Sequence, residues 1–200
     1  MITRDTLIHA VVLGGFSMAA AALLASSNLF TADEIKARAV EDLQASLTQV
    51  IPASIHDNSP VADAIQMKAP GGKDMTVYRA IKGGKVTGVA FESSGNGYAG
   101  EIRVIMGVDA DGKILGVRVV KHNETPGLGD KIEVAKNDWI TKFNGLFLGD
   151  PPVAQWAVKK DGGRFDQFAG ATITPRGTVN AIRDGLKYFA ANKAQMLEVR

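Results

Sequence analysis

Residues 100–120, GEIRVIMGVDADGKILGVRVV, predict the fold of the largest part of this chain. Two segments in which β-branched residues alternate with others, 100–108 and 113–120, flank the turn Asp109-Ala110-Asp111-Gly112. Such a turn between two alternating segments indicates a β-hairpin. The turn also resembles the start of a calcium loop, but the position that needs a bidentate Glu is Val120. We therefore interpret it as a plain β-turn.

The residues upstream of this hairpin continue the same pattern. Segments 76–81 and 85–92 are β-branched and alternating; Gly83-Gly84 separates them and Gly95-Asn96-Gly97 follows the second. Four successive strands with short turns predict an antiparallel sheet or half-barrel. Residues 56–73 are richer in Pro, Asp, Asn and Gly, and we expect them to form a loop at the entrance to this domain.

Helical patterns follow the predicted strands. Residues 130–143 are compatible with short helices, and residues 175–197 have a clear amphipathic pattern. The apolar stripe of that last segment consists of Val179, Ile182, Leu186 and Phe189. We therefore predict an α+β domain over residues 53–200, an antiparallel sheet or half-barrel with packed helices.

The amino-terminal part of the chain has the pattern of a membrane anchor. Residues 7–30, LIHAVVLGGFSMAAAALLASSNLF, contain no Asp, Glu, Lys or Arg. As a helix with a rise of about 1.5 Å per residue this segment would reach roughly 36 Å, and the hydrocarbon core of a bilayer is about 30 Å thick. We predict a transmembrane helix over 7–30, preceded by a short terminal segment, 1–6.

A cleaved signal peptide is the alternative interpretation, because the small-residue segment Leu24-Ala25-Ser26-Ser27 ends the apolar run. The basic region before the run is thin, since Arg4 is offset by Asp5, and the run is long for a signal peptide. Both observations favour a retained anchor. After it, residues 31–52 predict a linking amphipathic helix that starts at Thr31-Ala32-Asp33-Glu34, with apolar residues at every fourth position.

The composition excludes several kinds of chemistry. The chain has no cysteine, which excludes disulfides, thiolate metal sites, cysteine-ligated iron–sulfur clusters and thiol nucleophiles. Its three histidines are His9, His56 and His122, and they lack the short spacing of a paired metal site. The net charge of +2 does not indicate nucleic-acid binding. Redox or group-transfer chemistry in this chain would therefore need a borrowed cofactor.

One candidate site precedes the last predicted helix. Residues 166–175 read DQFAGATITP, in which Thr174 suits the N-cap and Pro175 the first helical position. The helix start would offer a phosphate-compatible turn at Gly170, Ala171 and Thr172. On composition alone, a simple helix cap is the commoner explanation of this pattern.

A second candidate is the loop 121–130, KHNETPGLGD. It follows a predicted strand and has glycines on both sides of an apolar Leu128, so it is either an ordinary connection in which Asp130 caps a helix or a ligand-covering loop. In the second case Leu128 would lie on a flat ring and Glu124 and Thr125 would offer polar contacts. We interpret the neighbouring His122 as a surface residue, because no nucleophile or metal pattern lies nearby.

Several motifs together resemble one family. They are residues 124–132 (ETPGLGDKI), 156–163 (WAVKKDGG) and 165–175, with Gly97-Tyr98 before a strand and a terminal helix. This pattern is similar to the G subunit of the Rnf electron transport complex. A related family is the C subunit of the sodium-translocating NADH:quinone reductase, which shares the FMN-binding domain.

The resemblance implies that Thr172 carries covalent FMN through a phosphodiester, attached from FAD by a flavin transferase. It implies that Gly170 and Ala171 allow close approach at the attachment point, and that Glu124, Thr125 and Leu128 line the flavin ring, with Tyr98 as a further candidate. One residue departs from the family pattern: Ala169 stands where Ser or Thr is usual.

The resemblance also implies a location and a role. The FMN domain would lie on the periplasmic face of the inner membrane, with residues 1–6 in the cytoplasm. The flavin would relay electrons between neighbouring centres of a complex that couples ferredoxin and NAD redox chemistry to ion movement, with the other subunits and the lipid bilayer as partners. No independent catalysis is expected of the isolated chain.

Two other functions compete with this one. A membrane-anchored ligand-binding or assembly module would lack redox turnover. A free-standing flavin reductase would oxidise NADH, which we do not expect because the chain has no nucleotide-binding fingerprint.

Overall fold

The structure is a computed structural model that describes residues 3–198, and the chain divides into two units after Leu43. Helix α1, Arg4–Val50, forms the first unit and enters the second. Within the described residues, the segment Arg4–Ala32 is long and apolar enough to cross a membrane, judged by length and composition. The predicted anchor, residues 7–30, falls within this segment.

The break expected at Thr31 is absent from α1. The Thr31 hydroxyl donates to the carbonyl of Ser27 at 2.9 Å, a bond that a threonine makes inside a helix and not at its cap. No proline or glycine interrupts the residues that follow, so the helix continues to Val50. The second unit begins at Gln44, within α1, and Leu47 is buried in it.

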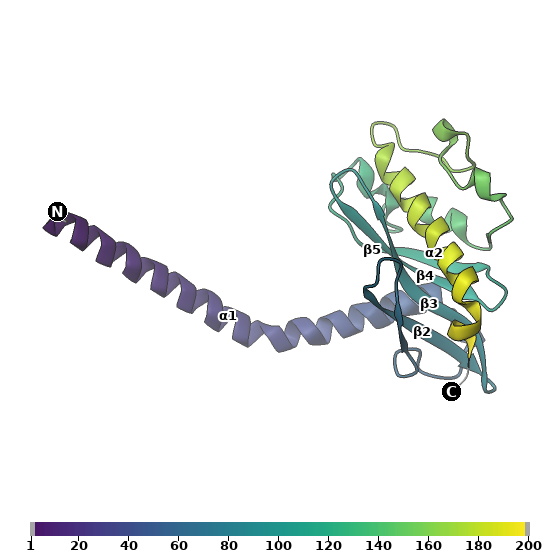
Figure 1. Ribbon diagram of the computed structural model, residues 1–200, viewed down its shortest axis with the longest axis horizontal. Coiled ribbons are helices and arrows are strands. Elements are labelled where there is room, and N and C mark those ends of the chain that lie inside the picture. Colours follow the sequence, from purple (N-terminus) through teal and green to yellow (C-terminus); the bar gives the residue numbers. More distant parts are fainter. Residues whose placement is uncertain (1–2, 199–200) are drawn as a thin grey trace. The chain divides into compact units, whose positions relative to one another are not determined.

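The second unit is built on a five-stranded antiparallel sheet in sequential order (Figure 1). Its strands are β1 Ile65–Lys68, β2 Asp74–Lys82, β3 Lys85–Asn96, β4 Glu101–Asp109 and β5 Ile114–Lys121. The hairpin prediction is confirmed: the Asp109 carboxylate accepts hydrogen bonds from the amides of Asp111 and Lys113, both at 2.9 Å.

Two details of the sheet differ from the sequence expectation. Strand β1 lies in the stretch expected to be loop, where Ile65 pairs with Val77 and Met67 is buried. A four-residue edge strand is too short to stand out from a polar neighbourhood. Gly95 and Asn96, expected to form a turn, belong to β3, which is longer than its alternating pattern indicates.

Helix α2, Ile173–Leu197, packs across one face of the sheet against β3 and β4 (Figure 1). Its predicted stripe of Val179, Ile182, Leu186 and Phe189 is buried. Gly95 and Gly177 bring the two backbones together, since a Cβ on Gly177 would lie 2.1 Å from the carbonyl oxygen of Asn96. The end of α1 packs on the opposite face, where a Cβ on Gly107 would lie 2.0 Å from the carbonyl oxygen of Val50.

Short 3-10 helices connect β5 to α2 and gather beside the start of α2 (Figure 1). They are η2 Gly129–Ile132, η3 Asp138–Phe143, η4 Val153–Gln155 and η5 Lys159–Asp161, while η1 Ala53–Ile55 follows α1. Buried aromatic rings of η3 pack against rings of the segment between η5 and α2: the ring centroids of Phe143 and Phe165 are 4.4 Å apart and those of Trp139 and Phe168 are 5.3 Å apart. This cluster holds the chain that leads into α2.

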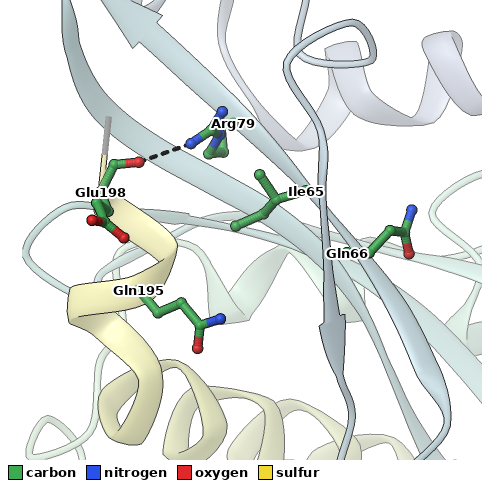
Figure 2. A pocket seen from close by; sticks show the side chains of 5 residues that line it. All are labelled: Ile65, Gln66, Arg79, Gln195 and Glu198. Atoms are coloured by element: carbon green, nitrogen blue, oxygen red, sulfur yellow. Dashed lines mark hydrogen bonds between the residues drawn. The ribbon is translucent and has the colours of Figure 1, made fainter. Parts of the chain in front are cut away.

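The other end of α2 is held by a buried arginine (Figure 2). Arg79 is 8% exposed, and it donates from Nε to the carbonyl of Asp63 and from Nη1 to the carbonyl of Glu198, both at 2.8 Å. A cation at the carboxyl end of a helix is stabilised by the helix dipole. Arg79 therefore connects β2 to the last turn of α2, beside a cavity of about 300 Å³ that Gln66 and Gln195 also line.

Candidate functional site

The start of α2 differs by two residues from the sequence expectation. The N-cap is Thr172 and not Thr174, and its side chain makes no capping hydrogen bond. The carbonyl of Thr172 accepts from the amide of Arg176 at 3.3 Å, the first hydrogen bond of the helix. Thr172 is half-buried, so its hydroxyl stands at the amino-terminal end of the helix dipole without a capping role.

Thr174 lies inside the first turn because its hydroxyl has another partner. The side chain is 1% exposed and donates a short hydrogen bond to the Glu124 carboxylate. Pro175 is tolerated at the third helical position, since the first amides of a helix have no partner within it. The helix thus begins at Ile173, and the prediction that Thr174 caps it was wrong.

Glu124 joins three segments that are far apart in the sequence. Its carboxylate is 5% exposed, and it accepts from the amide of Ala99 at 3.0 Å and from the amide of Tyr98 at 3.3 Å. Together with Thr174, these donors satisfy the carboxylate without a cation. Glu124 therefore holds the β3–β4 turn against the start of α2.

Glycines make room for this arrangement. A Cβ on Gly97 would lie 2.4 Å from a carboxylate oxygen of Glu124, and a Cβ on Gly129 would lie 2.8 Å from the hydroxyl of Thr174. Gly170 has φ of 79°, a left-handed conformation that favours glycine just before the helix start. The close packing around Glu124 thus depends on positions where a side chain would not fit.

These segments enclose a cavity of about 470 Å³, and all seven residues proposed from the sequence line it. The seven are Tyr98, Glu124, Thr125, Leu128, Gly170, Ala171 and Thr172. The structure adds Gly129, Ile173 and Thr174, which the sequence interpretation left out. Gly129 and Thr174 belonged to motifs already quoted, but nothing in their spacing indicated that they face the same cavity.

The cavity combines an apolar rim with a polar base. Tyr98, Leu128 and Ile173 are 78%, 44% and 42% exposed, so three large apolar side chains offer surface at the same cavity. The base holds the buried Glu124 carboxylate and the amino end of α2. The arrangement suits a flat apolar ring with an anionic group attached, because the rim offers apolar surface and the helix end favours negative charge.

The expectation that His122 is a surface residue was wrong. Its side chain is 15% exposed, its Nδ1 accepts from the amide of Glu124 at 3.0 Å, and its Nε2 lies 2.8 Å from the Glu133 carboxylate. Asp130 does not cap a helix, as one of the two interpretations of this loop supposed: it lies within η2 and pairs with Lys136 at 2.9 Å. Sequence reasoning missed this network because its members pair across a loop.

Charged groups around the cavity show consistent pKa shifts. The hydrogen bonds from Lys136 and His122 lower the pKa of Glu133, and the bond from Lys136 lowers that of Asp130. The hydrogen bond from Lys159 lowers the pKa of Asp166, whose carbonyl also accepts from the Trp139 indole at 2.9 Å. Glu133, Asp130 and Asp166 are therefore ionised at neutral pH.

The segment before Thr172 is fastened at two further points. Arg176 donates to Asp161 through two hydrogen bonds of 2.6 and 2.8 Å, and this pairing lowers the pKa of Asp161. Ala171 donates its amide to the carbonyl of Phe168 at 3.1 Å, which closes the turn at Gly170. The position of the Thr172 hydroxyl is thus set by contacts on both sides of it.

Comparison with known proteins gives concordant results. A family model described as an FMN-binding domain matches residues 97–187. The chain is 52% identical to the G subunit of the ion-translocating oxidoreductase complex of Cereibacter sphaeroides, over 96% of this chain and 87% of the relative. It is 44% identical to the protein of the same name from Pseudomonas aeruginosa, over 97% of this chain and 93% of the relative.

A solved structure has the same fold. The crystal structure of NqrC from Shewanella oneidensis aligns with a TM-score of 0.51 and 26% identity, covering 76% of this chain and 73% of that one.

Proposed function

The chain belongs to the family of G subunits of ion-translocating oxidoreductase complexes, and from this we propose that it is an FMN-carrying electron-transport subunit of such a complex. The FMN-binding domain match covers the β3–β4 turn, β4, β5, the loop after β5 and most of α2. The cavity described above lies within that match. The single observation that carries the proposal is that Thr172 lines this cavity and that its hydroxyl makes no capping hydrogen bond.

The residues present fit FMN. The phosphate would lie at the amino end of α2, where Gly170 and Ala171 leave the backbone accessible and the helix dipole favours an anion. The ring would contact Leu128 and Tyr98, which offer exposed apolar surface, and Thr125 lies at the same rim. Glu124 shapes the cavity through its backbone contacts, since its carboxylate oxygens already accept hydrogen bonds.

We propose that Thr172 holds FMN covalently. A flavin transferase would use FAD: a bond forms between Thr172 Oγ1 and the FMN phosphorus, the pyrophosphate bond breaks, AMP leaves and the hydroxyl loses its proton. The uncapped hydroxyl supports this role, because a threonine whose oxygen accepts from the helix amides would have to give up that bond first. Ala169 is exposed.

Bound FMN supplies reversible electron transfer. The chain itself would hold the ring in an apolar rim and keep the phosphate tethered, so that the cofactor stays at a permanently high local concentration. With α1 as anchor we place the domain on the periplasmic side of the inner membrane, where a dissociable cofactor would be lost by dilution. The other subunits of the complex would be its electron-transfer partners.

The test is flavin fluorescence in a denaturing gel. The full chain is co-expressed with a flavin transferase, and the wild-type band is expected to fluoresce, while Thr172→Ala gives a dark band. Peptide mapping should find FMN on the peptide containing Thr172. A dark band from folded wild-type protein would instead favour the alternative, a membrane-anchored binding or assembly module without redox turnover. Fluorescence that persists in Thr172→Ala would move the attachment to another residue.

A further inference from the structure

His122 carries an arrangement that none of the roles above uses. Its Nδ1 accepts a hydrogen bond from the backbone amide of Glu124, and a backbone amide is only a donor. Its Nε2 faces the carboxylate of Glu133, which is only an acceptor when ionised. The ring is therefore the neutral tautomer with its proton on Nε2, and both of its nitrogens are used.

The amide that His122 holds belongs to the residue that joins the cavity together. Glu124 connects the β3–β4 turn to Thr174, two residues beyond Thr172. The ring is 15% exposed, so a lost bond to it would not be replaced freely by water. The chain of contacts thus runs from Glu133 through His122 and Glu124 to the first turn of α2.

We infer that His122 is a positioning residue: its neutral form fixes the Glu124 loop and thereby sets the start of α2 and the hydroxyl of Thr172. A second proton on the ring would bind to Nδ1, and this N–H and the amide of Glu124 would then be two donors that face each other. The bond to Glu124 is therefore present when the ring is neutral and is lost as the pH falls. Flavin attachment at Thr172 should therefore be slower in acid, because this hydrogen bond within the chain is lost. This inference rests on the proposed function.

The charged groups around the ring do not cancel this effect. Glu133 favours the protonated ring, but the same carboxylate oxygen also accepts from Lys136 at 2.9 Å. Asp130, on η2, pairs with the same lysine at 2.9 Å. Lys121 precedes the ring on β5, and the Glu124 carboxylate is satisfied by other donors. None of these groups restores an acceptor for the amide of Glu124.

The test compares wild type with His122→Asn. The asparagine oxygen can accept from the amide of Glu124 at the position of Nδ1, but it does not titrate. In the full chain without flavin, in detergent, the backbone amide resonance of Glu124 should follow the titration of the His122 ring in wild type and stay constant in His122→Asn. An amide resonance that ignores the ring titration would overturn the inference.

The second measurement is the initial rate of flavin attachment at one pH above and one pH below the ring transition found in the first measurement. The wild-type rate, divided by that of His122→Asn at the same pH, should fall roughly three- to tenfold in acid, the factor that one net hydrogen bond supplies. The ratio removes the pH dependence of the transferase. A ratio that stays constant would overturn the inference. If no variant ever carries flavin while the amide still follows the ring, the proposed function fails and the positioning of the loop stands.

Discussion

Replacing Gly177 with alanine should separate α2 from β3. The new Cβ would lie 2.1 Å from the carbonyl oxygen of Asn96 and 2.8 Å from its carbonyl carbon, both backbone atoms. The helix and the strand would have to move apart by about 1 Å to reach an ordinary contact distance. Overpacking of this kind costs about 1–3 kcal/mol or more, and the better helix propensity of alanine returns at most about 1 kcal/mol. Because both clashing atoms belong to the backbone, the cost lies at the upper end of this range, and we expect a net loss of about 2 kcal/mol.

Gly185→Ala is the matched control, because it makes the same change in the same helix. The nearest atom to its new Cβ is the sulfur of Met106 at 2.5 Å, the flexible part of a side chain that can turn away. Its free energy of unfolding should stay within about 1 kcal/mol of wild type. The difference in stability between the two variants thus distinguishes the effect of a clash with the backbone from that of a clash with a side chain.

The assay is thermal unfolding of the full chain in detergent, followed by tryptophan fluorescence. Trp139 and Trp156 are 2% and 0% exposed, so both report on the core of the second unit. For a protein of this size, about 2 kcal/mol corresponds to a Tm lower by about 4–8 °C. Because Asn96 precedes the turn that Glu124 holds, Gly177→Ala should also slow flavin attachment. Equal Tm values for the two variants would refute the argument from backbone contact.

Three further changes test other parts of the structure. Arg79→Met should lower the free energy of unfolding by about 2–4 kcal/mol, because the carbonyls of Asp63 and Glu198 lose a charged donor. Backbone hydrogen exchange around Glu198 should also become faster. Unchanged exchange there would contradict the role of Arg79. The pKa of Glu133 is lower in the folded protein than the ordinary value of about 4.3, so its ionised form stabilises the fold above that pH. This contribution is lost as the pH falls through the pKa of the folded protein, and the urea midpoint should therefore drop in acid. Lys136→Met should make the drop smaller, because the hydrogen bond from Lys136 is the largest cause of the shift. Thr172→Ser should keep flavin in the denaturing gel, since the hydroxyl is retained; a dark serine band from folded protein would show that the attachment needs the threonine methyl group as well.

The fold was largely predictable because its main signals are local. Alternation in residues 100–120 specifies strands and a turn, and the stripe from Val179 to Phe189 specifies a helix with one buried face. Strand β1 and the uninterrupted α1 were missed for the opposite reason. A four-residue edge strand is stabilised by its partner β2, and a helix continues through a possible cap when nothing stops it.

The candidate site was predictable in its members but not in their arrangement. The motifs around Glu124 and Thr172 were visible through their resemblance to a family, and all of the expected residues line one cavity. The spacing suggested Thr174 as the cap, and only the contact with Glu124 shows why Thr172 holds that position instead. His122 looked like a surface residue because its partners cannot be identified from its neighbours in the chain.

The sequence by itself determined the apolar amino-terminal helix, the antiparallel sheet, the last helix and the absence of thiol chemistry in this protein, because each depends on composition or on a period of a few residues. The tertiary structure alone decided which threonine hydroxyl lies at the cavity without making a capping hydrogen bond. That choice depends on a buried carboxylate whose donors lie 25, 26 and 50 residues away, and hydrogen bonds over such separations leave no periodic trace in a sequence.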